Sequence, residues 1–129
     1  LHEGHIQILE QAKSCCNQLI VAVGTDEFMR IRKGREPVLS YNERVQIVRA
    51  IKYVDMVVAE EDLDKIAAYQ KYKFDVMFAG DDHEHEDIYV REAKILKDQY
   101  GVDTIYIKRS DVSSTKIRER VCMIQNKAF

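Results

Sequence analysis

Apolar positions along the chain follow two spacings, one typical of helices and one typical of buried strands. Ile6, Leu9, Ala12 and Cys16 recur at helical intervals, and the run QLIVAVGT (18–25) follows them directly. A continuous, β-branched apolar run of that length is typical of a strand that is buried on both faces. The pattern therefore predicts a helix followed by a strand.

The same alternation continues along the rest of the chain. Ser40 and Glu43 have the spacing of a capping box, and the helix that begins there would bury Val45, Val48 and Ile51. Beyond it, strands are predicted at 53–61, 75–80 and 102–109, and helices at about 62–72, 87–100 and 114–127. Strands that alternate with helices in this way predict βαβ units with right-handed crossovers. The expected fold is therefore α/β, with a parallel sheet covered by helices on both faces.

The first predicted helix has no predicted strand before it. A helix that begins at Gly4 or His5 would leave the sheet without a centre. We therefore expect the first strand of the fold in about a dozen residues preceding Leu1, enough for a strand and a turn. The chain contains no linker, repeat or low-complexity tract, so residues 1–129 are expected to form a single domain.

Composition and charge narrow the classes of partner. The 129 residues are 46% hydrophobic and 33% charged, and 20 Lys and Arg against 22 Asp and Glu leave a net charge of −2. No overall basic field favours nucleic acid, and no apolar run approaches the roughly 20 residues of a membrane-spanning helix. We therefore expect neither nucleic-acid binding nor membrane insertion. Cys15, Cys16 and Cys122 form no metal-type C-x-x-C pair and suit reduced thiols, which predicts a cytoplasmic protein.

The expected architecture locates the functional residues. In open parallel sheets, ligands bind beyond the carboxyl ends of the strands, where loops lead into helices. The polar groups at that edge would come from residues 24–33, 80–85 and 109–116. The turn at the start of the chain joins them if a strand precedes it.

Two histidines lie at the N-terminus of the first predicted helix. His2 and His5 are separated by Glu3 and Gly4. The helix dipole and backbone N–H groups favour anions there, and the glycine lets a phosphate approach the backbone closely. Two surface histidines without a ligand are the alternative interpretation. Zinc is less favoured, because H-x-x-H is one residue short of the H-E-x-x-H spacing and no thiol pair completes a site.

The stretch MRIRKGREP (29–37) concentrates positive charge after a predicted strand. It contains Arg30, Arg32, Lys33 and Arg35. One interpretation is a solvated basic loop. The other is a strand-end loop that closes over a triphosphate, because Arg and Lys side chains bind phosphate oxygens.

Acidic residues and histidines follow the strand predicted at 75–80. Asp81, Asp82, His83 and His85 could bind a metal ion or make polar contacts to a sugar or substrate. We favour polar contacts and predict no dedicated metal site.

An arginine and three hydroxyl residues lie near the start of the last predicted helix. Ser113, Ser114 and Thr115 follow Arg109, and their side chains could cap the helix or donate to phosphate. Capping alone would explain them, so both interpretations stay open.

Taken in order, these motifs resemble a known family. They are H-E-G-H (2–5), Lys-Gly (33–34), N-E-R (42–44), Y-V-D (53–55), G-D-D (80–82) and R-S-x-x-S-S-T-K-I (109–117). The set is similar to that of the cytidylyltransferases within the HxGH nucleotidyltransferase superfamily, above all the enzymes that act on glycerol 3-phosphate. The resemblance extends from the first residue to about residue 121, nearly the whole chain.

The resemblance implies a fold and a reaction. The fold would be a Rossmann-like three-layer sandwich with a parallel sheet. The reaction would move CMP from CTP to a phosphorylated alcohol, glycerol 3-phosphate first among them, and give a CDP-alcohol and pyrophosphate. The implied partners are CTP, accompanied by Mg²⁺, and a small phosphorylated alcohol, and the chain would form a homodimer. In-line attack on the α-phosphorus requires no covalent nucleophile, and the sequence offers no obvious one.

The resemblance also assigns roles to individual residues. His2 and His5 would stabilise charge that develops at the α,β-bridge of CTP. Lys33 would neutralise the α-phosphate and the incoming phosphate, and Arg109 would bind the β- and γ-phosphates. Arg44 would hold the phosphorylated alcohol. Further contacts to the nucleotide would come from Gly4, Asp82, Ser113, Ser114 and Thr115.

Two departures from the family pattern leave the acceptor open. The segment between Arg109 and Ser113 lacks the Gly usual in the glycerol 3-phosphate enzymes, and His83 stands where those enzymes tend to carry Trp. Two alternatives therefore stay open: an adenylyltransferase of the same superfamily that uses ATP, and a nucleotide-binding module without turnover.

Overall fold

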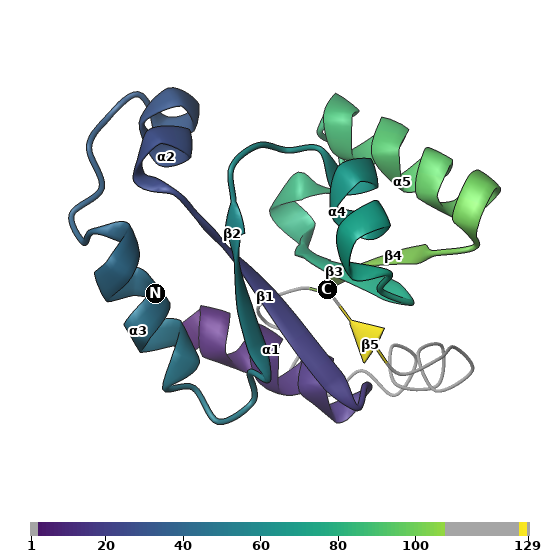
Figure 1. Cartoon of the computed structure of the whole chain (residues 1–129). Coiled ribbons are helices and arrows are strands. Elements are labelled where there is room, and N and C mark those ends of the chain that lie inside the picture. Colours follow the sequence, from purple (N-terminus) through teal and green to yellow (C-terminus); the bar gives the residue numbers. More distant parts are fainter. Residues whose placement is uncertain (1–2, 108–126, 129) are drawn as a thin grey trace.

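The computed structural model describes residues 3–107 and 127–128 as an α/β fold built on a five-stranded parallel sheet (Figure 1). The strands lie in the order β2-β1-β5-β3-β4, and every pair is parallel. In chain order the elements are α1 (Glu3–Ser14), β1 (Gln18–Gly24), α2 (Asp26–Lys33), α3 (Tyr41–Arg49), β2 (Met56–Glu60), α4 (Lys65–Tyr72), β3 (Val76–Gly80), the 3-10 helix η1 (Asp81–His83), α5 (Asp87–Tyr100), β4 (Asp103–Ile107) and β5 (Lys127–Ala128). The predicted α/β class with a parallel sheet is confirmed.

Helices α1 and α3 cover one face of the sheet. Leu19 of β1 is buried together with Ala12 of α1, and Val23 of β1 is buried against Val45 of α3. Val21 lies between the two strand residues and packs against both clusters. Because side chains on the same face of a strand are two residues apart, these contacts place both helices on one side.

Helices α4 and α5 cover the opposite face. Met77 of β3 is buried with Phe74 and with Leu96 of α5, whereas its neighbour Val76 belongs to the cluster under α1. Successive strand residues point to opposite faces. The molecule therefore has three layers, and the two helical pairs are visible on either side of the sheet in Figure 1. The Rossmann-like three-layer arrangement is confirmed.

The start of α3 confirms the predicted capping box. Ser40 accepts a hydrogen bond from the Glu43 backbone at 3.2 Å, and the Glu43 carboxylate accepts one from the Ser40 backbone at 3.3 Å. Val45 and Val48 are buried as predicted, but Ile51 lies beyond the last helical residue, Arg49. The cap fixes the point at which the chain turns back towards the sheet.

Helix α2 occupies residues for which the sequence predicted a loop. Thr25 accepts a hydrogen bond from the Phe28 backbone at 3.1 Å and begins the helix, and Gly34 ends it with a φ of 70°. The first turn is acidic and the last turn is basic, which complements the helix dipole. The prediction of a loop was therefore wrong for Arg30, Arg32 and Lys33, which are helical.

The two-residue strand β5 lies at the centre of the sheet. It pairs with β1 at Gln18 and Leu19 and with β3 at Val76. A helix was predicted through Lys127, and at that residue the prediction was wrong, because pairing with two flanking strands outweighs local helix preference. Residues 114–126 of that predicted helix lie outside the described residues.

Across the described part of the chain, no helix combines the length and apolar character that crossing a membrane requires.

Candidate active site at the carboxyl edge of the sheet

A cleft of about 980 Å³ lies at the carboxyl ends of the strands and continues between β1 and β3. Its floor is formed by apolar strand residues. Ionisable side chains reach it from the helices, the strand ends and the connecting segments, and include His5, Lys33, Arg35, Arg44, Glu60 and Lys65. Where Glu60 and Gly80 line it, the cleft lies at the edge at which open parallel sheets bind ligands.

Helix α1 brings His5 to the cleft. The helix begins at Glu3, so Gly4 and His5 lie in its first turn, and the His5 side chain lines the cleft. The positive end of the helix dipole favours an anion beside that turn. His2 lies outside the described residues, so the structure places one of the two predicted histidines.

The basic stretch divides into residues that face the cleft and residues that pair with acids. Lys33 ends α2, Arg35 follows Gly34, and both line the cleft. Arg30 instead forms an ion pair with Glu36, with 2.9 Å between Nη1 and Oε1. With Arg32, which also lines the cleft, the last turn of α2 and the segment after it therefore supply three cations to it.

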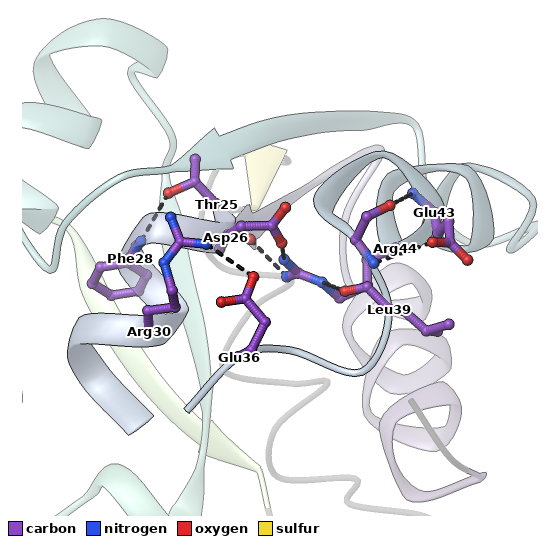
Figure 2. A network of polar contacts seen from close by, with 10 residues as sticks. Thr25, Asp26, Phe28, Arg30, Glu36, Leu39, Glu43 and Arg44 are labelled. Carbon is purple, nitrogen blue, oxygen red and sulfur yellow. Dashed lines mark hydrogen bonds and ion pairs between the residues drawn. The ribbon is translucent and has the colours of Figure 1, made fainter. Parts of the chain in front are cut away.

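Arg44 bridges three segments of the chain next to the cleft (Figure 2). Its guanidinium donates to the Gly24 carbonyl at 2.6 Å, to the Asp26 carboxylate at 2.7 Å and to the Leu39 carbonyl at 3.1 Å. A hydrogen bond from the Tyr41 backbone and then the contact with Arg44 lower the pKa of Asp26. Arg44 thus lines the cleft and is held there by partners within the protein.

The segment after β3 carries an aromatic stack. His83 lies on the Tyr89 ring with 4.6 Å between centroids and 11° between planes, and His83 Nδ1 lies 3.0 Å from Glu86 Oε1. Glu86 also faces Arg32 of α2 at 3.9 Å, so this pair connects the two sides of the cleft. The backbone of Asp82 lies in η1 at the end of β3, and its side chain is outside the described part.

Metal ligands do not cluster in the described residues. No group of three or more His, Cys, Asp or Glu side chains among residues 3–107 and 127–128 is arranged to hold a metal ion.

The sequence analysis missed an ion pair at the end of β2. Lys65 Nζ lies 2.6 Å from Glu60 Oε2, and the two side chains are only 11% and 18% exposed. The Lys65 backbone N–H donates to Glu92 at 2.7 Å, and burial raises the pKa of that carboxyl. Glu60 is the last residue of its strand, so the rule that selected the other strand-end segments applied to it as well.

The remaining predicted residues are Arg109, Ser113, Ser114 and Thr115, all of which lie outside the described residues.

Comparisons with known proteins identify the family of the chain. A family model described as cytidylyltransferase-like matches residues 1–120. The glycerol-3-phosphate cytidylyltransferase of Bacillus subtilis is 37% identical over 94% of this chain and 88% of its own length. The FAD synthase of Korarchaeum cryptofilum is 38% identical over 94% of this chain and 84% of its own length. The crystal structure of a lipopolysaccharide core biosynthesis protein from Thermoplasma volcanium matches with a TM-score of 0.66 at 26% identity, over 84% of this chain and 85% of that one.

The family match covers the residues that line the cleft. The matched residues include the first four strands of the sheet and all the helices that line the cleft. Histidine and lysine side chains at that edge suit a reaction on phosphate groups. We conclude that the chain belongs to the cytidylyltransferase-like family and is a nucleotidyltransferase.

Proposed function

We propose that the protein transfers CMP from CTP to glycerol 3-phosphate or a closely similar phosphorylated alcohol. A phosphate oxygen of the acceptor attacks the α-phosphorus of CTP. The bond between that phosphorus and the α,β-bridging oxygen breaks, and pyrophosphate leaves with the electron pair. The products are a CDP-alcohol and pyrophosphate, and no covalent enzyme intermediate forms.

The observation that carries this proposal is the convergence of three cationic or hydrogen-bonding side chains on one cleft. His5, Lys33 and Arg35 reach it from the start of α1, the end of α2 and the segment after α2. A reaction that develops negative charge on bridging and terminal phosphate oxygens is accelerated by such donors when they are held in place. Lys33 would act on the α-phosphate and the incoming phosphate, and His5 on the bridging oxygen.

The relatives support cytidylyl transfer and also supply a second candidate. Glycerol-3-phosphate cytidylyltransferases from Bacillus subtilis and Staphylococcus aureus are each 37% identical to the chain. The FAD synthase of Korarchaeum cryptofilum is as similar, at 38% identity. Adenylyl transfer from ATP to a flavin phosphate is therefore the competing hypothesis, and it shares the cleft and the chemistry.

Further contacts are proposed on the family resemblance. CTP would enter as its Mg²⁺ complex. His2 and Arg109 would complete the catalytic cations, and Gly4 and Asp82 would contact the nucleotide together with Ser113, Ser114 and Thr115. A homodimer is likewise expected, and sedimentation equilibrium would test it directly.

The test is a measurement of pyrophosphate release by the purified full-length protein. CTP and ATP are each offered with Mg²⁺ and a panel of acceptors that contains glycerol 3-phosphate, phosphocholine, phosphoethanolamine, sugar phosphates and flavin mononucleotide. We expect release with CTP and glycerol 3-phosphate. His5→Ala should lower kcat by roughly 10²- to 10³-fold, the usual cost of removing one donor to the transition state.

Glu10→Ala is the matched control, because Glu10 is exposed on α1, the helix that carries His5, and does not line the cleft. It should leave kcat within about twofold of the unmodified protein. Release with ATP alone would assign the protein to the adenylyltransferases. Tight binding of CTP without release from any acceptor would reduce it to a nucleotide-binding module.

A further inference from the structure

The contacts of Arg44 set it apart from the other cations at the cleft. A guanidinium has five N–H donors, and those of Arg44 are directed at three acceptors, two at the junction of β1 with α2 and one just before α3. These acceptors are Gly24 at the end of β1, Asp26 in the first turn of α2 and Leu39 just before α3. The Arg44 side chain is only 18% exposed. Such an arginine is held in one orientation by the protein itself.

The charge of Arg44 is also offset locally. The Asp26 carboxylate lies 2.7 Å from the guanidinium and also accepts a hydrogen bond from the Tyr41 backbone. A phosphate that bound Arg44 directly would have to displace a carboxylate or approach it closely, and repulsion between the two anions would weaken that contact. The pair is therefore better suited to joining segments than to binding an anion.

The segment that Arg44 fixes carries the cations of the cleft. It runs from Lys33, the last residue of α2, to Leu39, whose carbonyl accepts the hydrogen bond from Arg44 Nε at 3.1 Å. Arg35 lies within this segment and lines the cleft together with Lys33. Near its middle, the segment is further tied to α2 by the Arg30–Glu36 ion pair. Release of Leu39 would free the far end of the segment.

We propose that Arg44 and Asp26 act as a pair of positioning residues, which hold the segment from Lys33 to Leu39 so that its cations face the transferring phosphate. Arg44 then affects the chemical step through Lys33 and Arg35, instead of binding the acceptor phosphate as the family resemblance implied. This inference rests on the proposed function for its kinetic consequence. Its structural consequence, an ordered segment, does not depend on turnover.

The kinetic test compares Asp26→Asn, Arg44→Gln and the double variant. Positioning predicts that each single variant lowers kcat by roughly 10- to 100-fold, since misplacing a catalytic group by about 1 Å has costs of this size. The KM for the acceptor should change little. The double variant should be no worse than the more affected single variant, because Asp26→Asn weakens and Arg44→Gln removes the same connection.

The Arg44→Lys variant further distinguishes a positioning role of Arg44 from direct binding of the acceptor phosphate. Lysine keeps the charge but cannot reach three acceptors with a planar fork, so positioning predicts no rescue. Direct phosphate binding predicts partial rescue by lysine, a large rise in acceptor KM for Arg44→Gln and little effect of Asp26→Asn. That pattern would overturn the proposal.

Limited trypsin digestion provides the second readout. Arg32, Lys33 and Arg35 are cleavage sites in or beside the segment. Asp26→Asn and Arg44→Gln should each speed cleavage there at least several-fold without substrate, because local opening exposes the backbone to the protease. Arg49→Gln, at the exposed end of the same helix, should digest like the unmodified protein.

Circular dichroism melts establish that the compared variants are folded. If Arg44→Gln does not fold, the test rests on Asp26→Asn, which is the milder substitution. Unchanged cleavage in folded variants would overturn the proposal. Faster cleavage in a protein that turns over no nucleotide would instead reject the proposed function and leave the positioning role standing.

Discussion

Lys13 and Asp55 form an ion pair, with 2.6 Å between the Lys13 Nζ and the Asp55 Oδ2. The same carboxylate oxygen accepts a hydrogen bond from the Leu19 backbone N–H at 2.7 Å, and the Asp55 N–H donates to the Leu19 carbonyl at 3.0 Å. These contacts join the last turn of α1 to the starts of β1 and β2, at the amino edge of the sheet. The Asp of the Y-V-D motif therefore organises the fold.

Two substitutions at Asp55 should have different costs. Asp55→Ala removes the acceptor for the Leu19 N–H and should lower the free energy of unfolding by about 1–2 kcal/mol, whereas Asp55→Asn keeps an acceptor and should cost less. The partly exposed ion pair adds at most about 1 kcal/mol. Urea unfolding measures both, with the exposed Asp98→Asn as control. Equal costs for the two variants would assign the effect to the charge alone.

The protein should lose stability in acid through two carboxylates. Hydrogen bonds from the Tyr41 backbone and from Arg44 lower the pKa of Asp26, and those from Lys13 and Leu19 lower the pKa of Asp55. Each carboxylate stabilises the fold above its ordinary pKa of 3.8, and this contribution is lost as the pH falls through the lower folded-state pKa.

Urea midpoints measured from about pH 6 down to about pH 3 would test this. We expect the decrease to be smaller in the double variant Asp26→Asn, Asp55→Asn than in the unmodified protein. Parallel pH curves for the two proteins would contradict the assignment.

Glu92 should have the opposite effect on the pH dependence of the unfolding free energy. Burial raises its pKa above the ordinary 4.5, although the Lys65 backbone donates to it. Its contribution is therefore most favourable below pH 4.5 and declines as the pH rises through the raised folded-state pKa. Glu92→Gln keeps an acceptor for Lys65 and should raise the unfolding free energy at neutral pH by roughly 0.5 kcal/mol. Exposed Glu61→Gln is the control, and a loss of stability in Glu92→Gln would refute the prediction.

Gly24→Ala should disturb the junction between β1 and α2. A methyl group at this position would lie 2.8 Å from Met29 Sδ and 3.2 Å from Phe28 Cδ2. Overpacking of this kind typically costs about 1–3 kcal/mol. Denaturant unfolding should show a smaller cost when the same substitution is made in a Met29→Ala background. An unchanged cost there would mean that the clash is not with Met29.

Lys33→Gln should reduce turnover far more than a substitution at its helical neighbour Arg30. Lys33 lines the cleft, whereas the Arg30 guanidinium pairs with Glu36. For the proposed reaction, kcat should fall by roughly 10²- to 10³-fold in Lys33→Gln. In Arg30→Gln the decrease in kcat should be about tenfold at most, because this substitution removes only the ion pair with Glu36 that ties the segment to α2. Steady-state kinetics with CTP and acceptor would distinguish them, and equal losses would remove the special role of Lys33.

The sequence predicted the layers of the fold well because they depend on local periodicity. The capping box at Ser40 and the apolar run of β1 both specify structure within a few residues. Helix α2 was missed even though its signals were present, with Thr25 before an acidic first turn and Gly34 after a basic last turn. Dense positive charge favours a loop when it is considered alone, but the caps at both ends of α2 outweigh it.

The candidate site was predictable in position but not in its internal contacts. The rule for parallel strands pointed to His5 and Lys33, and the family resemblance to Arg44, and all three line one cleft. It could not reveal that Arg44 is held by acceptors up to 20 residues away in the sequence. Nor could it reveal the pairing of Lys65 with Glu60, since such contacts depend on how α2, α3 and α4 pack in three dimensions.

The short central strand leaves few backbone pairs between the two halves of the sheet. Among the described residues, β5 joins the halves through only the pairs Gln18–Lys127, Leu19–Ala128 and Val76–Ala128, all near the amino ends of β1 and β3. Within each half, by contrast, β1–β2 and β3–β4 pair along five residues each. The halves are therefore also joined by side-chain packing, because Val76 of β3 and Leu19 of β1 are buried in one apolar cluster with Ala12 of α1.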